Sequence, residues 1–422
     1  MPVDAAGLEP WEAESRRRAK DGLLALFPLR DVSEYGHRTF GQRTERAARS
    51  GLSWDQIALA PPLFTPKRFE RMLELGREPY FSDVDLSTKV GGFASPVPFY
   101  LSAMGGTSAA SHGGFALATT AAQRGIPLVL GENISTVRGY EKRTQADHPS
   151  FKERAKAYLK ALPEKLGGLV IQQSVEDADS ELWNHVYSDP DFEPLLATGR
   201  LGFELKCGQG AKPGLGGLTL VGAADAKRLK TKFLVQEHDI GHSHRMRHSA
   251  PGTYTEEILR NQVRLMRNNY PRARIWIKLP PTRDVDAAAA TCWDAGADAV
   301  TVDGAEGGTG LAPSAFLDHM GLPLLECLFL LGRPDAKHCL HVSGGFHEGA
   351  RIVKALCLGA RAVGLGRAAL AAHDADEDHG LGKFFDVLDL ELRMLVSGLG
   401  KYRVPDLAAE DLFLPRGTVP TF

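Results

Sequence analysis

The stretch CLHVSGGFHEGARIVKALCLGARAVGLGRAAL (residues 339–370) contains one complete strand-helix-strand unit. Residues 339–345 and 362–366 are short apolar runs, which is typical of parallel strands buried on both faces. The segment between them has the apolar spacing of a helix and ends at Gly359, a residue type favoured just past a helix C-terminus. The stretch therefore predicts a β-α-β unit.

The same alternation of apolar runs and helical segments repeats along most of the chain. There are eight such runs in all, and the other six are residues 97–104, 127–134, 168–174, 202–208, 274–280 and 299–304. Eight β-α units over roughly 270 residues match the number and size expected of a TIM barrel. An open doubly wound sheet, which also alternates strands and helices, is the alternative fold. We predict an α/β protein with a (β/α)₈ TIM barrel.

The positions of these runs predict how the chain is organised. Residues 1–94 are expected to form an N-terminal helical extension that packs on the barrel, 95–372 the barrel itself, and 373–422 a C-terminal helical tail. Residues 209–273 are too long for a plain crossover between strands four and five. They predict a long loop insertion after strand four, which shapes or covers the site at the barrel mouth.

Composition and charge exclude several classes of protein. The chain has 422 residues and a formal net charge of −2, so nothing in its balance favours nucleic-acid binding. Its five cysteines include no CxxC pair, which argues against a disulfide framework and favours a reducing compartment. The N-terminus lacks the apolar core of a signal peptide, and no apolar run is long enough to span a membrane. We therefore expect a cytoplasmic protein that binds neither membrane nor nucleic acid.

Polar residues stand at the carboxyl ends of the predicted strands, where barrel active sites form. Amides, a carboxylate and two lysines stand at consecutive strand ends. Such groups can form hydrogen bonds to the edge of a polar heterocyclic ligand. The candidate ligand-binding residues are Ser102, Ala103, Met104, Gly105, Asn133, Gln173, Lys206, Lys278 and Asp303.

The last two strands end in glycine-rich turns that suit a phosphate group. Glycines let backbone N–H groups approach an oxyanion closely, and the N-terminus of the following helix adds a favourable dipole. In barrels these two loops often form the phosphate site. The candidates are Ser343, Gly344, Gly345, Gly366 and Arg367; each turn taken alone is also compatible with a simple strand-helix connection.

Two further segments carry candidate substrate-binding and catalytic residues. In KCGQGAKPGLGG (206–217), Gln209 and Lys212 lie among glycines, and Lys212 is either a point charge for a carboxylate or a solvated surface lysine. In HDIGHSHRMRH (238–248), His242 and His244 are the candidate general bases. Arg245 and Arg247 are the candidates for binding a carboxylate through both guanidinium nitrogens. A metal site is disfavoured there because the histidines lack ligand spacing and the arginines repel cations, and an exposed loop is the remaining alternative. We predict no metal.

Two motifs resemble those of a known family. GQGAKPGLGG (208–217) is similar to the QGAKPGxGG signature of the FMN-binding synthase domain of glutamate synthases and their stand-alone relatives, and DGAEGGTG (303–310) resembles that family's DGxxGGTG segment. The resemblance spans roughly residues 95–370. It implies FMN at the barrel mouth, with Asp303, Gly307 and Gly308 among the cofactor-binding residues.

The resemblance also implies roles for individual residues. The phosphate would lie on the last two strand-end turns, and the backbone of 103–105 would lie near the reactive edge of the flavin. Gln173, Lys206 and Lys278 would face the pyrimidine side, where a lysine stabilises the anionic reduced ring. Gln209 and Lys212 match positions that contact the substrate.

The chain also departs from the family. Glutamate synthases carry three cysteines for a 3Fe–4S cluster after the last strand, whereas residues 368–386 contain none, so we expect no cluster. The full-length enzymes also begin with a glutaminase domain, and we expect none in this chain. The histidine-rich segment 238–248 differs from the family pattern, which leaves the substrate open.

These observations predict an FMN-dependent oxidoreductase that acts on CH–NH or C=N groups. Hydride would pass between flavin N5 and an amino acid, an imine or a related polar carboxylate. The other half-reaction would use O₂, a nicotinamide or an electron-transfer partner, and a homo-oligomer is a further possibility. Two alternatives are a barrel that uses reduced flavin for a non-redox isomerisation and a flavin-binding accessory subunit. The predicted catalytic residues are Lys206, Gln209, Lys212, His242, His244 and Lys278.

Overall fold

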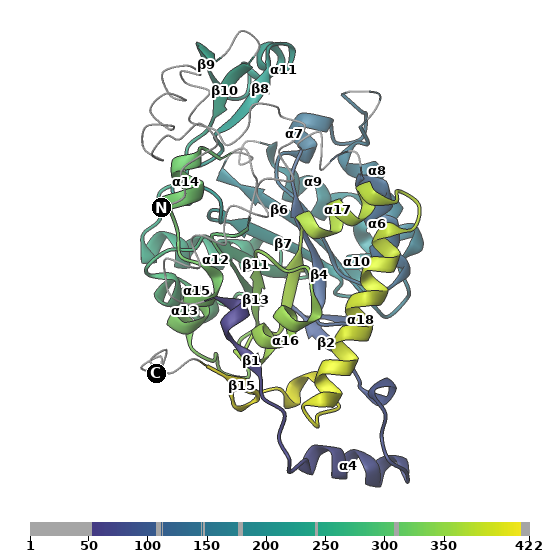
Figure 1. Ribbon diagram of the computed structural model, residues 1–422. Coiled ribbons are helices and arrows are strands. Elements are labelled where there is room, and N and C mark those ends of the chain that lie inside the picture. Colours follow the sequence, from purple (N-terminus) through teal and green to yellow (C-terminus); the bar gives the residue numbers. More distant parts are fainter. Residues whose placement is uncertain are drawn as a thin grey trace, which may run out of the picture.

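The computed structural model describes residues 53–106, 111, 113–144, 146, 148–175, 180–240, 244–307 and 312–414. Eight parallel strands close into a barrel (Figure 1), which confirms the predicted fold and places all eight strands within a few residues of the predicted runs. In chain order they are β4 (Phe99–Met104), β5 (Leu128–Leu130), β6 (Leu169–Ser174), β7 (Leu201–Lys206), β11 (Arg274–Leu279), β12 (Ala299–Asp303), β13 (Leu340–Ser343) and β14 (Ala362–Leu365).

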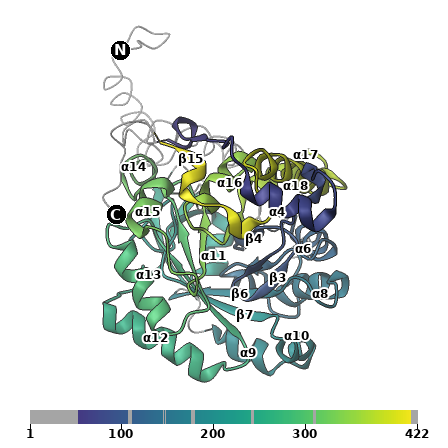
Figure 2. The ribbon, with the colours of Figure 1, turned by 90° about the horizontal axis from the view of Figure 1, so that it is seen from below.

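Helices surround the barrel, as Figure 2 shows from the opposite end. Their inward faces carry Leu, Ile, Val and Ala side chains that pack on the outside of the strands in one large core. The helices are α6 (Gly114–Gln123), α7 (Ile134–Arg138), α8 (Phe151–Ala161), α9 (Leu182–Ser188), α10 (Glu193–Ala197), α12 (Glu256–Asn269), α13 (Val285–Asp294), α14 (Ser314–His319), α15 (Leu324–Leu331), α16 (Gly349–Cys357), α17 (Arg367–Ala375) and α18 (Gly380–Gly398).

The amino-terminal end of the barrel is closed. A hairpin of β2 (Thr88–Val90) and β3 (Phe93–Ser95) packs across it, and the Gly91 carbonyl accepts a hydrogen bond of 3.0 Å from Nε1 of Trp276. A Cβ atom at Gly91 would lie 2.2 Å from the indole ring of Trp276, so only glycine fits there. Because aromatic side chains fill this end, a ligand reaches the barrel interior from the carboxyl ends of the strands.

The insertion after the fourth barrel strand lies where the sequence predicts it, but it is a folded element and not a plain loop. Strands β8 (Thr219–Gly222), β10 (His244–His248) and β9 (Leu234–Ile240) form an antiparallel sheet, with α11 (Ala223–Leu229) beside them. Figure 1 shows this subdomain at the top of the molecule, above the barrel mouth. Phe233 packs against Val137 of α7, which joins the insertion to the barrel.

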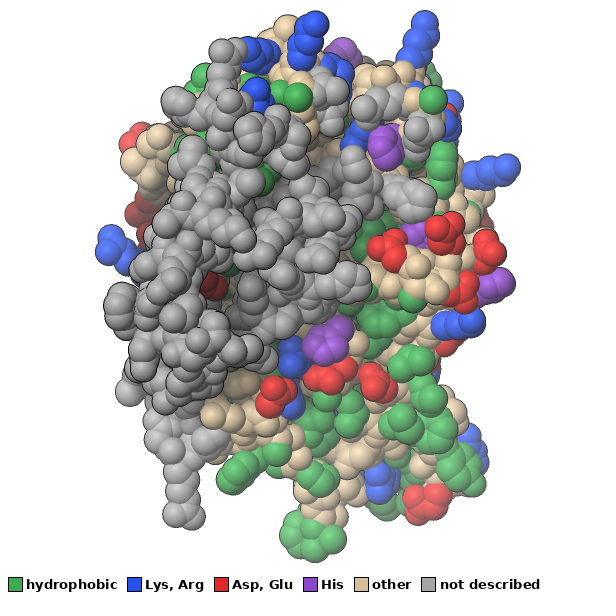
Figure 3. All heavy atoms as spheres, turned by 45° about the horizontal axis from the view of Figure 1, so that its top comes forward, with side chains coloured by type: hydrophobic (Ala, Val, Ile, Leu, Met, Phe, Trp, Pro, Cys, Tyr) green, Lys and Arg blue, Asp and Glu red, His purple; other side chains and the backbone are tan. Residues whose placement is uncertain are grey.

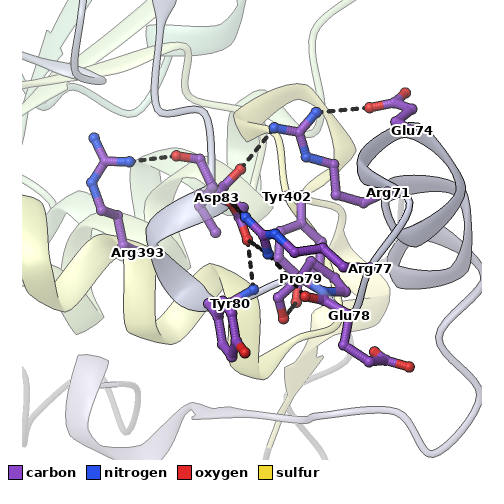
Figure 4. Close-up of polar contacts among 10 residues, drawn as sticks. Arg71, Glu74, Arg77, Glu78, Pro79, Tyr80, Asp83, Arg393 and Tyr402 are labelled. Carbon is purple, nitrogen blue, oxygen red and sulfur yellow. Dashed lines mark hydrogen bonds and ion pairs between the residues drawn. The ribbon is translucent and has the colours of Figure 1, made fainter.

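The segment before the barrel projects from its closed end. Helix α4 (Pro66–Leu75) has no buried residue, and the predicted helical stretch 12–27 lies outside the described residues. Polar contacts hold the base of α4, as Figure 4 shows. Arg71 donates to the Asp83 carbonyl at 3.2 Å, and the guanidinium of Arg77 binds both carboxylate oxygens of Asp83 at 2.7 and 2.8 Å. At the C-terminal end, β15 (Leu412–Phe413) pairs with β1 (Ala58–Leu59).

We expect this attachment to weaken in acid. Arg77 and the Tyr80 backbone N–H lower the pKa of the Asp83 carboxyl from 3.8 to about 2. Since the folded-state pKa is the lower one, the stabilisation is complete above about pH 4 and is lost as the pH falls toward 2. Hydrogen exchange of the α4 amides should therefore accelerate in that window. In Asp83→Asn, exchange should be fast at every pH; unchanged protection in that variant would contradict the assignment.

Candidate active site

Two lysines stand side by side at the carboxyl end of the barrel. Strands β7 and β11 are hydrogen-bonded neighbours, and their register pairs Lys206 with Lys278. Both side chains are largely buried, with 11% and 9% of their surface exposed. The sequence predicts both as site residues, and the structure brings them together on adjoining strands.

Asp303 connects three loops at the mouth. Its Oδ2 lies 3.5 Å from Nζ of Lys278 and accepts a 2.9 Å hydrogen bond from the backbone N–H of Gly210. Its Oδ1 accepts from the Ser343 hydroxyl at 2.6 Å. The carboxylate is 1% exposed and each oxygen is hydrogen-bonded, as a buried charge requires. Asp303 therefore fixes the positions of Lys278 and of the loops that follow β7 and β13.

Lys206 has a partner of opposite charge. Its Nζ lies 2.5 Å from Oε1 of Glu132, which follows β5, and 2.8 Å from Oε1 of Gln209. Asn133, the next predicted ligand-binding residue, is buried and has a left-handed backbone with φ of 66°. Glu132 and Asn133 are both polar residues at this strand end in the sequence, but only Asn133 is predicted to bind a ligand.

A buried carboxyl group lies one layer below the lysines. Glu204 accepts hydrogen bonds from Nε2 of Gln172 at 2.5 Å and from the Thr301 hydroxyl at 3.1 Å, and it is 2% exposed. Burial raises the pKa of Glu204, while Lys278 and these two donors act in the opposite direction. Sequence reasoning missed this residue because it lies inside an apolar run; a lone carboxylate in a buried strand was the available signal.

In the glycine turn after β13, the backbone lies very close to the loop that follows β12. Gly344 and Gly345 have φ values of 117° and 77°, which favour glycine. A Cβ at Gly344 would lie 2.9 Å from the backbone nitrogen of Gly307, and one at Gly307 would lie 2.0 Å from Oδ1 of Asp303. These predicted phosphate-site and cofactor-site residues therefore form one junction with Asp303, whereas Gly308 lies outside the described residues.

The turn after β14 begins helix α17. Gly366 is its N-cap residue, and a Cβ there would meet open space within 4 Å. Arg367 donates from Nη2 to the carbonyl of Glu306 at 2.5 Å, which links this turn to the loop after β12. An open helix N-terminus beside a second glycine turn is a suitable place for an oxyanion.

The end of the first barrel strand, β4, also lies very close to glycines next to it. Ser102 is 6% exposed, and a Cβ at Gly364 on the neighbouring β14 would lie 2.1 Å from its hydroxyl oxygen. A Cβ at Gly131 would lie 2.6 Å from the carbonyl group of Met104. Glycines on both neighbouring strands thus leave room for the backbone of residues 102–105 at the mouth.

Other predicted residues lie in the loops around the mouth. Gln173 donates from Nε2 to the Ser180 hydroxyl at 3.1 Å. Lys212 is 3% exposed, and its Nζ donates to the Leu218 carbonyl within its own loop. Arg247 lies on β10 with its guanidinium 3.8 Å from the centre of the Phe233 ring.

Arg245 shares strand β10 with Arg247. The position of His242 and the side chain of His244 lie outside the described residues. Cys207 is not suited to act as a nucleophile, because burial raises the pKa of its thiol to about 12. No helix in the described part of the chain is long and apolar enough to cross a membrane.

The mouth therefore combines two chemical environments. Lysines, amides and carboxylates line the ends of β6, β7, β11 and β12, and glycine turns with a helix N-terminus follow β13 and β14. The first set can hold the polar edge of a heterocycle and stabilise negative charge on it. The second can hold a phosphate through backbone N–H groups. A phosphorylated heterocyclic cofactor fits both.

Comparisons with known proteins agree with this geometry. Residues 198–376, from β7 to α17, match the family described as "Conserved region in glutamate synthase". An archaeal-type glutamate synthase [NADPH] of Dehalococcoides mccartyi is 34% identical over 193 residues, covering 42% of this chain and 36% of that protein. The archaeal glutamate synthase [NADPH] of Methanocaldococcus jannaschii is 32% identical over 176 residues, covering 40% and 34%. The chain thus spans about a third of the length of these relatives.

Solved structures share the fold at low sequence identity. A soluble mutant of (S)-mandelate dehydrogenase from Pseudomonas putida has a TM-score of 0.55 and 19% identity, covering 96% of this chain and 99% of that one. A mandelate oxidase mutant has a TM-score of 0.58 and 18% identity, covering 96% and 98%. These likenesses support the barrel fold.

Proposed function

We propose that this chain, which contains the conserved region of glutamate synthase in residues 198–376, is an FMN-dependent oxidoreductase of the glutamate synthase-like family. Hydride would pass between flavin N5 and an amino acid, an imine or a related polar carboxylate. The observation that carries the proposal is the pairing of Lys206 with Lys278 in register, next to the glycine turns of the last two strands.

The residues at the mouth fit FMN. The N–H groups of Gly344, Gly345 and the α17 N-terminus would hold the phosphate, and Lys278 would face the pyrimidine edge of the ring. When bound, the flavin supplies the hydride acceptor or donor. Lys278 stabilises negative charge at that edge, while Asp303 keeps its ammonium group in place.

The remaining predicted residues would act on the substrate. We propose that Gln209 and Lys212 contact its carboxylate, with Arg245 and Arg247 as further clamps and His242 or His244 as the general base. Glu132 and Gln209 both bind Lys206. The ammonium group of Lys206 is therefore held between the Glu132 carboxylate and Gln209. Gln209 belongs to the loop that follows β7, here called the substrate loop, so this contact fixes the substrate loop at the barrel mouth.

An absorption spectrum of the purified protein tests the cofactor assignment. We expect flavin bands, or their appearance on FMN titration, followed by anaerobic bleaching with a member of an amino-acid panel. A colourless protein that takes up no FMN would contradict the proposal. Turnover that needs only catalytic amounts of reductant would favour an isomerase, and bound flavin that no substrate reduces would favour an accessory subunit.

We further propose that the enzyme works in the cytoplasm on a small-molecule substrate. Its five cysteines are all free thiols, which suits a reducing compartment. An electron-transfer partner and a homo-oligomer stay predictions. Light scattering of the purified protein measures its oligomeric state directly.

A further inference from the structure

A buried arginine at the side of the barrel forms no ion pair with a carboxylate among the residues that the structure describes. Arg154, in the first turns of α8, is 2% exposed, and its Nε donates a long 3.4 Å hydrogen bond to the Pro149 carbonyl. Its Nη2 is buried without a hydrogen-bond partner. Burial and, to a smaller extent, the nearby Arg138 together lower the pKa of Arg154 from 12.5 to about 10. An unpaired buried charge of this kind is costly unless something of opposite charge accompanies it.

The guanidinium of Arg154 faces the start of helix α6. A Cβ at Gly114, the first residue of α6, would lie 3.0 Å from Nε of Arg154 and 3.1 Å from its Cζ. The N-cap residue Gly113 has no side chain that caps the helix. A helix N-terminus carries partial positive charge, so a guanidinium against it is repelled unless an anion lies between or beside them.

Two more buried polar groups lie close to the start of α6. Ser111, three residues before Gly114, is fully buried and its hydroxyl has no hydrogen-bond partner. Arg138 of α7 is 4% exposed and binds the Gly106 carbonyl at 2.8 and 3.1 Å. Two buried guanidinium groups therefore lie near the uncapped start of a ten-residue helix, and an unsatisfied hydroxyl lies three residues before it. Among the residues that the structure describes, no acidic side chain contributes to the pKa of Arg154.

This cluster is separate from the predicted flavin phosphate turn. A Cβ at Gly113 would lie 2.6 Å from Cδ2 of His373, which belongs to α17. His373 is six residues beyond Arg367, which corresponds to about 9 Å along the helix. The start of α6 thus lies well along α17 from the N-terminus that faces the mouth.

We propose that the start of α6, Arg154 and Ser111 form a second oxyanion site, which takes a phosphate or carboxylate group. The Nη2 group of Arg154, the Ser111 hydroxyl and the first N–H groups of α6 are its donors. The anion would neutralise the buried guanidinium and cap the helix at once. Gly113 and Gly114 are required because side chains there would displace His373 and Arg154.

Thermal unfolding in phosphate-free buffer and in excess inorganic phosphate tests this site. We expect phosphate at about ten times its Kd to raise the Tm of the parent protein by about 2 °C. Arg154→Met should lose most of that rise. It should also melt no lower than the parent without phosphate, because the substitution removes an unpaired buried charge. If Arg154 is merely structural, the variant melts lower in both buffers by the same amount, and the proposal is wrong.

Matched variants separate this site from other phosphate binding. Arg264 on α12 is exposed, so Arg264→Met should keep the full phosphate effect. Arg367→Met, at the predicted flavin phosphate turn, should keep it as well. Loss of the effect in Arg367→Met with retention in Arg154→Met would overturn the proposal.

A direct binding measurement does not depend on the stability of Arg154→Met. Equilibrium dialysis with radiolabelled phosphate should show a severalfold weaker Kd in Ser111→Ala than in the parent. An unchanged Kd would contradict the site. A parallel titration with acetate identifies the source: stabilisation by acetate and not by phosphate assigns the site to a carboxylate, and the reverse assigns it to phosphate. Stabilisation by neither overturns the proposal.

Discussion

Lys278→Ala is expected to slow the reduction of bound flavin by substrate about 10²- to 10³-fold, the usual effect of removing one donor that stabilises developing negative charge. Nζ of Lys278 is held 3.5 Å from Asp303 in a site that is nearly closed to water. Its loss removes one of the two positive charges proposed for the pyrimidine edge. The midpoint potential of the flavin should therefore fall by about 60–90 mV. Anaerobic stopped-flow reduction and a redox titration measure the two effects.

A second buried lysine serves as the control for that substitution. Lys354 lies on α16 and donates to the Trp54 carbonyl at 2.7 Å, remote from the strand ends. Lys354→Ala should lower thermal stability and leave the flavin potential at its original value. If Lys278→Ala binds and reduces FMN like the parent, the role assigned to Lys278 is wrong.

The sequence predicts the barrel and much of its mouth because both depend on local patterns. Apolar runs bounded by polar residues define each strand, and the polar residue that ends the run lies at the mouth of a parallel barrel. Lys206 and Lys278 could be predicted in this way. Their position opposite each other could not, because it depends on the register between β7 and β11, which are separated by the whole insertion.

The contacts that the sequence does not predict are the tertiary ones. Asp303 is identified as a strand-end carboxylate, but its bond to the Gly210 N–H joins residues 93 positions apart. Glu204 lies within a strand and becomes significant only when Gln172 and Thr301 are brought beside it. The insertion forms a small sheet whose strands are rich in polar residues, so the apolar alternation that marks strands is weak there.

Gly210→Ala is expected to have the second large effect, by separating the loops that Asp303 joins. A Cβ at Gly210 would lie 1.9 Å from the Gly304 carbonyl oxygen and 2.8 Å from that of Gly307. Both contacts are with backbone, so neither can be relieved by a side-chain rotation. The Gly210 N–H would be pushed away from Asp303, and its buried carboxylate would lose a donor. We expect a loss of about 2–3 kcal/mol in the free energy of unfolding.

Gly222→Ala is the matched substitution, because it lies in the same insertion and its Cβ meets nothing within 4 Å. It should leave both stability and flavin content unchanged, whereas Gly210→Ala should lower the Tm by on the order of 5 °C and reduce the bound FMN. Denaturant unfolding and the flavin-to-protein absorbance ratio measure these quantities. If the two variants differ as expected, the first glycine of the QGAKPG motif, Gly210, is needed because no larger residue lets the substrate loop approach Asp303. Equal behaviour of the two variants would show that this loop does not depend on that contact.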